Sequence, residues 1–325
     1  MAITPAPSMV ESLLSPVVLF FLLGFGAGIA RSDLSFPEAF AKGISLYLML
    51  AIGFKGGTEV AHAGFQWAVL GTAAVGIGAG FGLPFVAYAL LRNLTSLGRI
   101  DAAAIAAHYG SISVVTFVAG TDYLTRLAIP YDGFMIAIVA LMESPAIIAG
   151  LLLARRGDET STVTRSHFLR EALLNGSVVL LIGSFAIGLV TGEKGAAQLA
   201  PFIATPFKGV LCLFLLDMGL VAARRLRGSA HMNMRLFAFG LSMPLVGAVV
   251  GLLGAAAAGL SEGSATLLVI LCASASYIAV PAAMRVALPK ANPAYSLTLS
   301  LGVTFPFNLT VGIPLYATAT HHLLT

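Results

Sequence analysis

Apolar runs of about twenty residues recur along the whole chain, and they constrain its fold more than any other feature. An α-helix needs roughly 20 such residues to cross the hydrocarbon core of a bilayer. Only 10% of the 325 residues are charged, whereas a soluble domain carries about 25%. Polar side chains could not cover a water-soluble globule of this size, so the sequence predicts an all-α integral membrane protein.

Ten apolar runs predict ten transmembrane helices. A polar stretch at 155–170 follows the fifth run and is expected to be a cytoplasmic linker. It divides the chain into a first five-helix repeat, 1–154, and a second five-helix repeat, 171–325. The ten helices are expected near residues 13–30, 40–57, 66–91, 101–121, 132–154, 171–191, 201–222, 235–259, 264–287 and 294–319.

The positions of the basic residues support this topology. If the ten segments alternate in direction, fourteen of the 18 Lys and Arg residues fall on one side, and only Lys55, Arg126, Lys194 and Lys208 fall elsewhere. The positive-inside rule makes the richer side cytoplasmic. Both termini are then expected on the extracytoplasmic side of the membrane.

Weak internal similarity relates the two halves. The three matching pairs are offset by 163, 165 and 161 residues, which agree closely. Because five helices per half is an odd number, the second half must be inverted in the membrane. Inverted repeats of this kind are typical of secondary transporters. The pairs are 52–57 with 215–220, 109–115 with 274–280, and 144–146 with 305–307.

Glycine, serine and proline gather in the middle of the predicted fourth and ninth helices. We expect both helices to be broken near the midplane and to cross there. The backbone N–H groups at the new helix N-termini would then face an anion. Close packing of unbroken helices through small residues is the alternative. The predicted substrate-binding residues are Gly110, Ser111, Ile112, Ser113, Ser274, Ala275, Ser276 and Tyr277.

Acidic residues inside the membrane are costly and therefore indicate function. Glu143 precedes Ser144 and Pro145, and the proline leaves the carbonyl of Leu141 without its helical donor. These hard oxygen ligands suit a sodium ion; a proton relay or a structural ion pair is the alternative for Glu143. Asp217 could instead pair with Lys55. The predicted sodium-binding residues are Glu143, Ser144, Thr304, Asn308 and Asp217.

Signatures of soluble enzymes are missing from the sequence. It contains no Walker-type loop, no His-Glu-x-x-His, no nucleophile elbow and no cysteine cluster. Ser111 with His108 is the single candidate nucleophile–base pair. His108 is interpreted first as a packed, hydrogen-bonded residue, and a proton carrier is the alternative. We therefore expect neither enzymatic activity, nor a cofactor, nor a nucleic-acid partner.

Four motifs resemble the sodium-dependent bicarbonate transporter family first known from cyanobacteria: residues 52–57, 108–113, 143–146 and 300–308. The resemblance implies a 5+5 inverted-repeat fold, in which a mobile core domain slides against a gate or scaffold domain, and a homotrimer in the bacterial plasma (inner) membrane. It also implies sodium symport of bicarbonate near the crossing of helices 4 and 9. A cytoplasmic PII-like regulator binds cyanobacterial relatives, but the connection 155–170 is short for that role.

The residues and the resemblance together predict a sodium-coupled symporter that imports bicarbonate by alternating access. The expected partners are bicarbonate, sodium and membrane lipid. Transport of another small carboxylate or anion, coupled to sodium or to protons, is the first alternative, and a channel is the second.

Overall fold

The structure is a computed structural model that describes residues 14–63, 67–155, 176–228, 232–278, 280–281, 283–284 and 288–324. Helices form the regular structure of these residues, and no strand occurs among them. Within these described ranges, seven helical segments are long and apolar enough to cross a membrane. The predicted all-α membrane class is confirmed. The predicted linker, apart from Arg155, lies outside the described residues.

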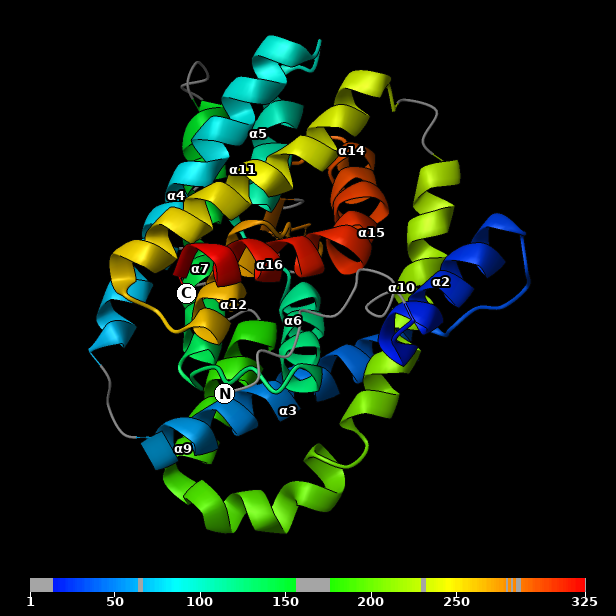
Figure 1. Cartoon of the computed structure of the whole chain (residues 1–325). Helices are drawn as coiled ribbons and strands as arrows, with labels where there is room; N and C mark the ends of the chain where they lie inside the picture. Colours follow the sequence, from blue (N-terminus) through cyan, green and yellow to red (C-terminus); the bar gives the residue numbers. More distant parts are fainter. Residues whose placement is uncertain are drawn as a thin grey trace.

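The helices follow the predicted segments closely at most boundaries (Figure 1). They are α2 (Pro16–Ile29), α3 (Glu38–Ala63), α4 (Ala68–Leu94), α5 (Arg99–Gly110), α6 (Val114–Arg126), α7 (Met135–Arg155), α9 (Gly176–Ile203), α10 (Phe207–Arg227), α11 (Met234–Ala258), α12 (Glu262–Cys272), α14 (Pro293–Leu297), η1 (Thr298–Thr304), α15 (Phe305–Phe307), η2 (Asn308–Gly312) and α16 (Ile313–Leu324).

Local sequence signals explain several of these boundaries. Ser15 caps α2 by accepting a hydrogen bond from the amide of Val18 at 3.3 Å, and Pro16 occupies the first helical turn, where no N–H partner is needed. Asn233 caps α11 in the same way. Gly259 ends α11 in the left-handed conformation (φ 63°) that glycine adopts without steric cost.

Two segments differ from the prediction. The sixth predicted helix ends at 191, but α9 turns at Gly192 (φ 54°, ψ −144°) and a further helical stretch continues to Ile203. The tenth predicted helix contains two π-helical stretches, η1 and η2, on either side of Phe305–Phe307. Pro306 lies between them and has no N–H for the regular helical ladder, so wider turns form around it.

The helices pack as two groups. The scaffold group comprises α2, α3, α9 and α10, in which α3 packs along α9 and α2 along α10. The core group comprises α4 to α7, α11, α12 and the last segment, α14 to α16. Figure 1 shows α2 and α10 on the right and the core group on the left. The groups meet mainly where α10 contacts η1, and where α3 and α9 contact α7.

Glycines let the scaffold helices approach backbone to backbone. A Cβ atom on Gly24 would clash with the carbonyl of Leu216, and one on Gly219 would clash with the carbonyl of Phe21. The same holds between α3 and α9, where Gly57 lies against the backbone of Phe185. Small residues at helix contacts are a common means of association in membranes.

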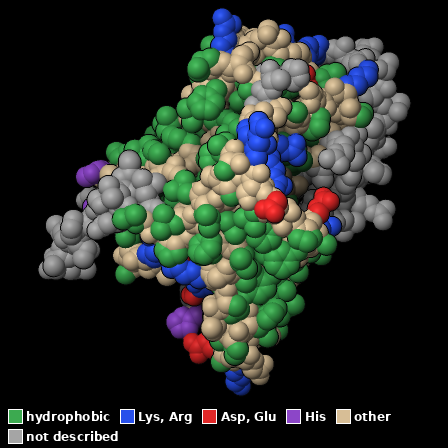
Figure 2. Space-filling view, turned by 90° about the vertical axis from the view of Figure 1, so that its right-hand side faces the viewer, with side chains coloured by type: hydrophobic (Ala, Val, Ile, Leu, Met, Phe, Trp, Pro, Cys, Tyr) green, Lys and Arg blue, Asp and Glu red, His purple; other side chains and the backbone are tan. Residues whose placement is uncertain are grey.

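Large apolar side chains cover much of the exterior. Figure 2 shows broad hydrophobic areas on one face of the molecule. Such an exterior suits contact with lipid rather than water. Among the exposed apolar residues are Leu22 and Leu23 of α2, Ile182 and Val190 of α9, and Val249 and Leu253 of α11.

Candidate functional site

The first helix interruption lies between α5 and α6. The helix stops at Gly110 and restarts at Val114, with Ser111 in an extended conformation (φ −89°, ψ 172°). Ser113 caps α6, since its hydroxyl accepts a hydrogen bond from the amide of Thr116 at 3.1 Å. The amides of Val114 and Val115 lie in the first turn, where a helix supplies no acceptor of its own. The break predicted in the fourth segment is therefore present.

The second interruption follows α12. The helix ends at Cys272, and residues 274–276 have no regular structure. The hydroxyl of Ser274 donates to the carbonyl of Leu271 at 2.8 Å. The Nδ2 amide of Asn308 donates to the carbonyl of Ala273 at 2.9 Å. Asn308 thus holds the chain at the point where it leaves the helix.

The two interruptions contact each other. The amide of Ser113 donates to the hydroxyl of Ser274 at 2.9 Å, and the amide of Ser276 donates to the carbonyl of His108 at 2.8 Å. All eight predicted substrate-binding residues lie in or beside these two stretches, and all are buried. The structure therefore gathers them at one place.

One buried hydroxyl at this place has no partner. The side chain of Ser111 is 1% exposed, and its Oγ atom makes no hydrogen bond within the described part of the chain. Leaving such a group unsatisfied costs about 1–3 kcal/mol. The Tyr277 hydroxyl lies beside the Ser113 side chain without a bond of good geometry. The site therefore offers hydroxyl groups that the protein itself does not use.

Glu143 approaches the interruptions from α7. Its side chain is 6% exposed. Ile147, one turn further along the same helix face, packs with Ala107, Val280 and Met284, which flank the two interruptions. Glu143 therefore lies on the face of α7 that packs towards these residues. Ser144 also lies in α7, but its side chain is outside the described residues.

Thr304 and Asn308 are bonded to protein groups. The Thr304 hydroxyl donates to the carbonyl of Gly240 at 2.7 Å, and so the Tyr109 hydroxyl, also at 2.7 Å, must be the donor to Thr304. The Oδ1 atom of Asn308 accepts from the hydroxyl of Tyr316 at 2.8 Å. Both residues support the interruptions, and their oxygens retain only a second lone pair for a cation.

Asp217 lies apart from the other predicted sodium ligands. It is nine residues, or about two and a half turns, from Leu226, which contacts Gly302 of η1. Asp217 therefore lies on the opposite face of α10 from the segment that holds Thr304. Lys55 is exposed and lines a cavity, and no Asp217–Lys55 ion pair occurs among the described residues.

A family comparison bears directly on this geometry. The family model described as the Na⁺-dependent bicarbonate transporter superfamily matches residues 16–321, nearly the whole chain. The chain belongs to this superfamily. The resemblance seen in the four motifs is thereby confirmed, and the chain is a multi-pass membrane protein of a transporter family. The search of curated proteins found no match.

Two cavities flank the first interruption of this superfamily member. The α6-side cavity, of about 550 Å³, lies between α6 and the scaffold helices α3 and α9. The α5-side cavity, of about 160 Å³, contacts Ala104 and His108 of α5. Since α5 precedes the interruption and α6 follows it, the cavities lie at its two ends. The α6-side lining includes Lys55, Thr58, Glu59, Phe117, Thr121, Asp122, Thr125 and Ala200.

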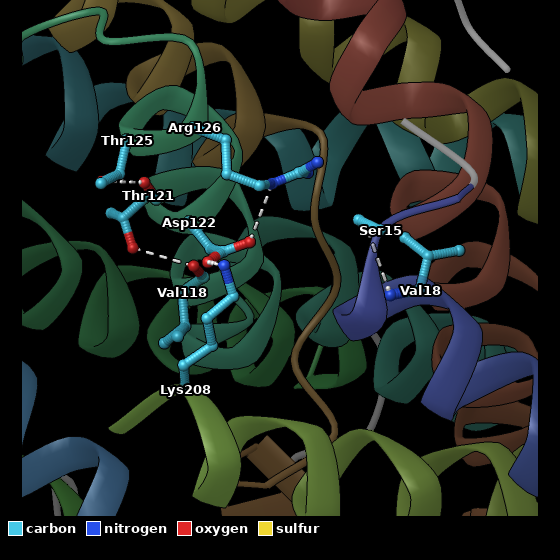
Figure 3. Close-up of polar contacts among 8 residues, drawn as sticks. All are labelled: Ser15, Val18, Val118, Thr121, Asp122, Thr125, Arg126 and Lys208. Atoms are coloured by element: carbon cyan, nitrogen blue, oxygen red, sulfur yellow. Dashed lines mark hydrogen bonds and ion pairs between the residues drawn. The ribbon is translucent and has the colours of Figure 1, made fainter. Parts of the chain in front are cut away.

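An ion-pair cluster links the core and scaffold groups beside the α6-side cavity. Asp122 of α6 contacts Lys208 of α10 at 3.4 Å and Arg126 at 3.1 Å (Figure 3). Thr121 and Thr125 bond to backbone carbonyls of the same helix. Asp122 and Lys208 therefore join an element of the core to an element of the scaffold.

Proposed function

We propose that the protein is a sodium-coupled symporter that imports bicarbonate by alternating access. In this proposal ten helices form two inverted five-helix repeats, and the core group slides against the scaffold group. The observation that carries the proposal is the buried, unpartnered hydroxyl of Ser111, which lies where two helix interruptions meet. The superfamily assignment supports an anion of this kind.

The chemistry of the site suits a small anion. Bicarbonate is planar, and its three oxygens can accept from the amides of Val114 and Val115 and from the Ser111 hydroxyl. The N-terminus of α6 adds a partial positive charge. A sodium ion beside Glu143 would offset the charge of the anion. Coupling follows if each ion improves the binding of the other by roughly 1–3 kcal/mol.

The assembly and orientation extend the same proposal. We place a homotrimer in the bacterial inner membrane with both termini extracytoplasmic. In this orientation α6 lies on the outer side of the first interruption, so the α6-side cavity would be the outer entrance. A PII-like regulator, if this chain binds one, would act on the cytoplasmic face. A small carboxylate such as a short organic acid fits the same donors and is the second candidate. A carboxylate group lacks the third oxygen of bicarbonate, and the site offers no group that would recognise that oxygen specifically.

Uptake of labelled bicarbonate into proteoliposomes tests the function directly. We expect accumulation that saturates and that requires an inward sodium gradient. Accumulation driven by a proton gradient alone would contradict sodium coupling. Saturable uptake of a small carboxylate, with no uptake of bicarbonate, would support a transporter function but with a different substrate.

Replacing Ser111 with alanine separates a binding role from a packing role. Because the hydroxyl has no protein partner, its removal should leave stability unchanged or raise it by about 1–3 kcal/mol. The KM for bicarbonate should nevertheless rise about tenfold, because one anion donor is lost. Thermal unfolding and uptake kinetics give the two readouts.

In the control Ser184→Ala, the lost hydroxyl donates to Leu181 in the scaffold, and KM should stay constant. An unchanged KM in Ser111→Ala would mean that the Ser111 hydroxyl does not bind the anion, and the proposal would lose its main support.

The Asp122–Lys208 ion pair tests the sliding motion. If the core moves against the scaffold, this pair breaks in every cycle. Asp122→Asn should then change the turnover rate by up to about fivefold at low salt, since an ion pair at the protein surface contributes about 0.2–1 kcal/mol. The effect should fade at high salt. In the control Glu193→Gln, the lost pair with His62 lies within the scaffold group, so turnover should not change. Equal turnover in both variants would argue against sliding at this interface.

A further inference from the structure

His108 makes two polar contacts with the second interruption. It lies near the end of α5 and is 1% exposed. Its backbone carbonyl accepts the amide of Ser276 at 2.8 Å, and its ring Nδ1 atom lies 2.7 Å from the carbonyl oxygen of Ser276. One residue of the first repeat thus bonds both backbone groups of one residue in the second.

The partner fixes the tautomer of the ring. A carbonyl oxygen can only accept, so Nδ1 must carry the hydrogen that Ser276 receives. In the neutral ring, Nε2 is then left with a free lone pair. The ring also borders the α5-side cavity, together with Pro281, Met284 and Ser296. The two nitrogens therefore have different surroundings and can be tested separately.

Ser276 needs this pairing because of where it lies. It belongs to a stretch without helical structure inside a membrane protein, where lipid offers no hydrogen bonds. His108 supplies both missing partners. Ser274, two residues earlier, accepts the amide of Ser113 at the N-terminus of α6. The position of Ser276 relative to α5, which we call the register of the two interruptions, therefore also sets the position of Ser274 relative to the proposed anion donors.

We propose that His108 is a positioning residue that sets the register of the two interruptions through its Nδ1–H group. The proposal rests on the proposed function, because the register matters only if the interruptions form the anion site. The imidazole would neither touch the anion nor carry a proton. Its single task is to hold the Ser276 carbonyl while the ring edge closes the α5-side cavity.

Two amide substitutions distinguish the ring nitrogens. The Nδ2 group of asparagine is as many bonds from Cα as Nδ1 of histidine, whereas the Nε2 group of glutamine matches histidine Nε2. We expect His108→Asn to keep the KM for bicarbonate within about threefold. We expect His108→Gln and His108→Leu to raise KM about tenfold or more, because the Ser276 carbonyl loses its donor.

Kinetics separate positioning from loss of fold. A variant that is merely less folded loses Vmax per total protein at constant KM, whereas a displaced site changes KM. Normal KM in His108→Gln together with a raised KM in His108→Asn would assign the role to Nε2 and overturn the proposal. Failure of His108→Asn to fold or transport would also overturn it.

A substrate-free measurement keeps this test independent of the proposed function. Melting temperatures in detergent without bicarbonate should rank the wild type and His108→Asn above His108→Gln and His108→Leu. If this order holds while the wild type takes up no bicarbonate, the register role stands and the assigned substrate fails. An equal melting temperature for all four proteins, with equal KM, would contradict the register role itself.

Discussion

Replacing Glu143 with glutamine is expected to abolish sodium-stimulated uptake while the protein remains folded. The two side chains have the same shape, so the packing of α7 should survive, but the negative charge is lost from a group that is 6% exposed. Opposite unit charges 4 Å apart attract by about 4 kcal/mol at an effective dielectric constant near 20. Sodium affinity should therefore fall about a thousandfold. Uptake at a series of sodium concentrations measures this change.

Two variants frame the Glu143 result. Glu143→Asp keeps the charge and should retain part of the sodium response. Glu59→Gln makes the same chemical change on an exposed residue of the α6-side cavity, and sodium dependence should persist. A wild type that follows a proton gradient and ignores sodium would instead make Glu143 a proton carrier. Full sodium response in Glu143→Gln would remove the residue from the site.

Replacing Gly110 with alanine should disrupt the site through packing alone. A Cβ atom at this position would clash with the Pro84 ring and crowd the carbonyl of Gly80 in α4. Overpacking of this kind costs about 1–3 kcal/mol. Because Gly110 is the last residue before the first interruption, the strain should displace Ser111 and lower uptake at least tenfold. Thermal unfolding and uptake of the same preparation measure both effects.

Gly78→Ala is the matched control for Gly110→Ala. Gly78 also lies in α4, and a Cβ atom added there would meet no atom within 4 Å. Alanine favours a helix over glycine by up to about 1 kcal/mol, so this variant should be as stable as the wild type or slightly more stable, with normal uptake. If both variants behaved alike, the close contact of α4 with α5 would not support the site.

The membrane class and the interruption of the fourth segment could be predicted because they depend on local composition. Apolar length marks a span, and a glycine beside two serines marks a point where a helix can stop. The sixth predicted helix ends beside the kink at Gly192, but the helical stretch from there to Ile203 is not predicted, because Glu193 and Lys194 interrupt the apolar run. The π turns around Pro306 are not predicted, because a proline in the sequence shows where the helical ladder is interrupted but not whether the turns beside it widen.

The partners inside the site could not be predicted from the sequence. His108 and Ser276 are 168 residues apart, and Tyr109 and Thr304 are 195 apart. A motif shows which residues carry chemistry but not which distant group will satisfy them. For the same reason the sequence suggests Thr304 and Asn308 as sodium ligands but does not show that they also bond to Gly240, Tyr109, Ala273 and Tyr316.

The glycine contacts of the scaffold group have a mechanical consequence. Where main chain touches main chain, as between Gly24 and Leu216 or Gly57 and Phe185, no layer of side chains is available to change rotamer and absorb shear. If the core group slides as proposed, deformation is left to the α6-side cavity between the two groups, which the Asp122–Lys208 ion pair bridges. The glycine contacts would then keep the scaffold group rigid, so that displacement occurs between the groups and not within the scaffold.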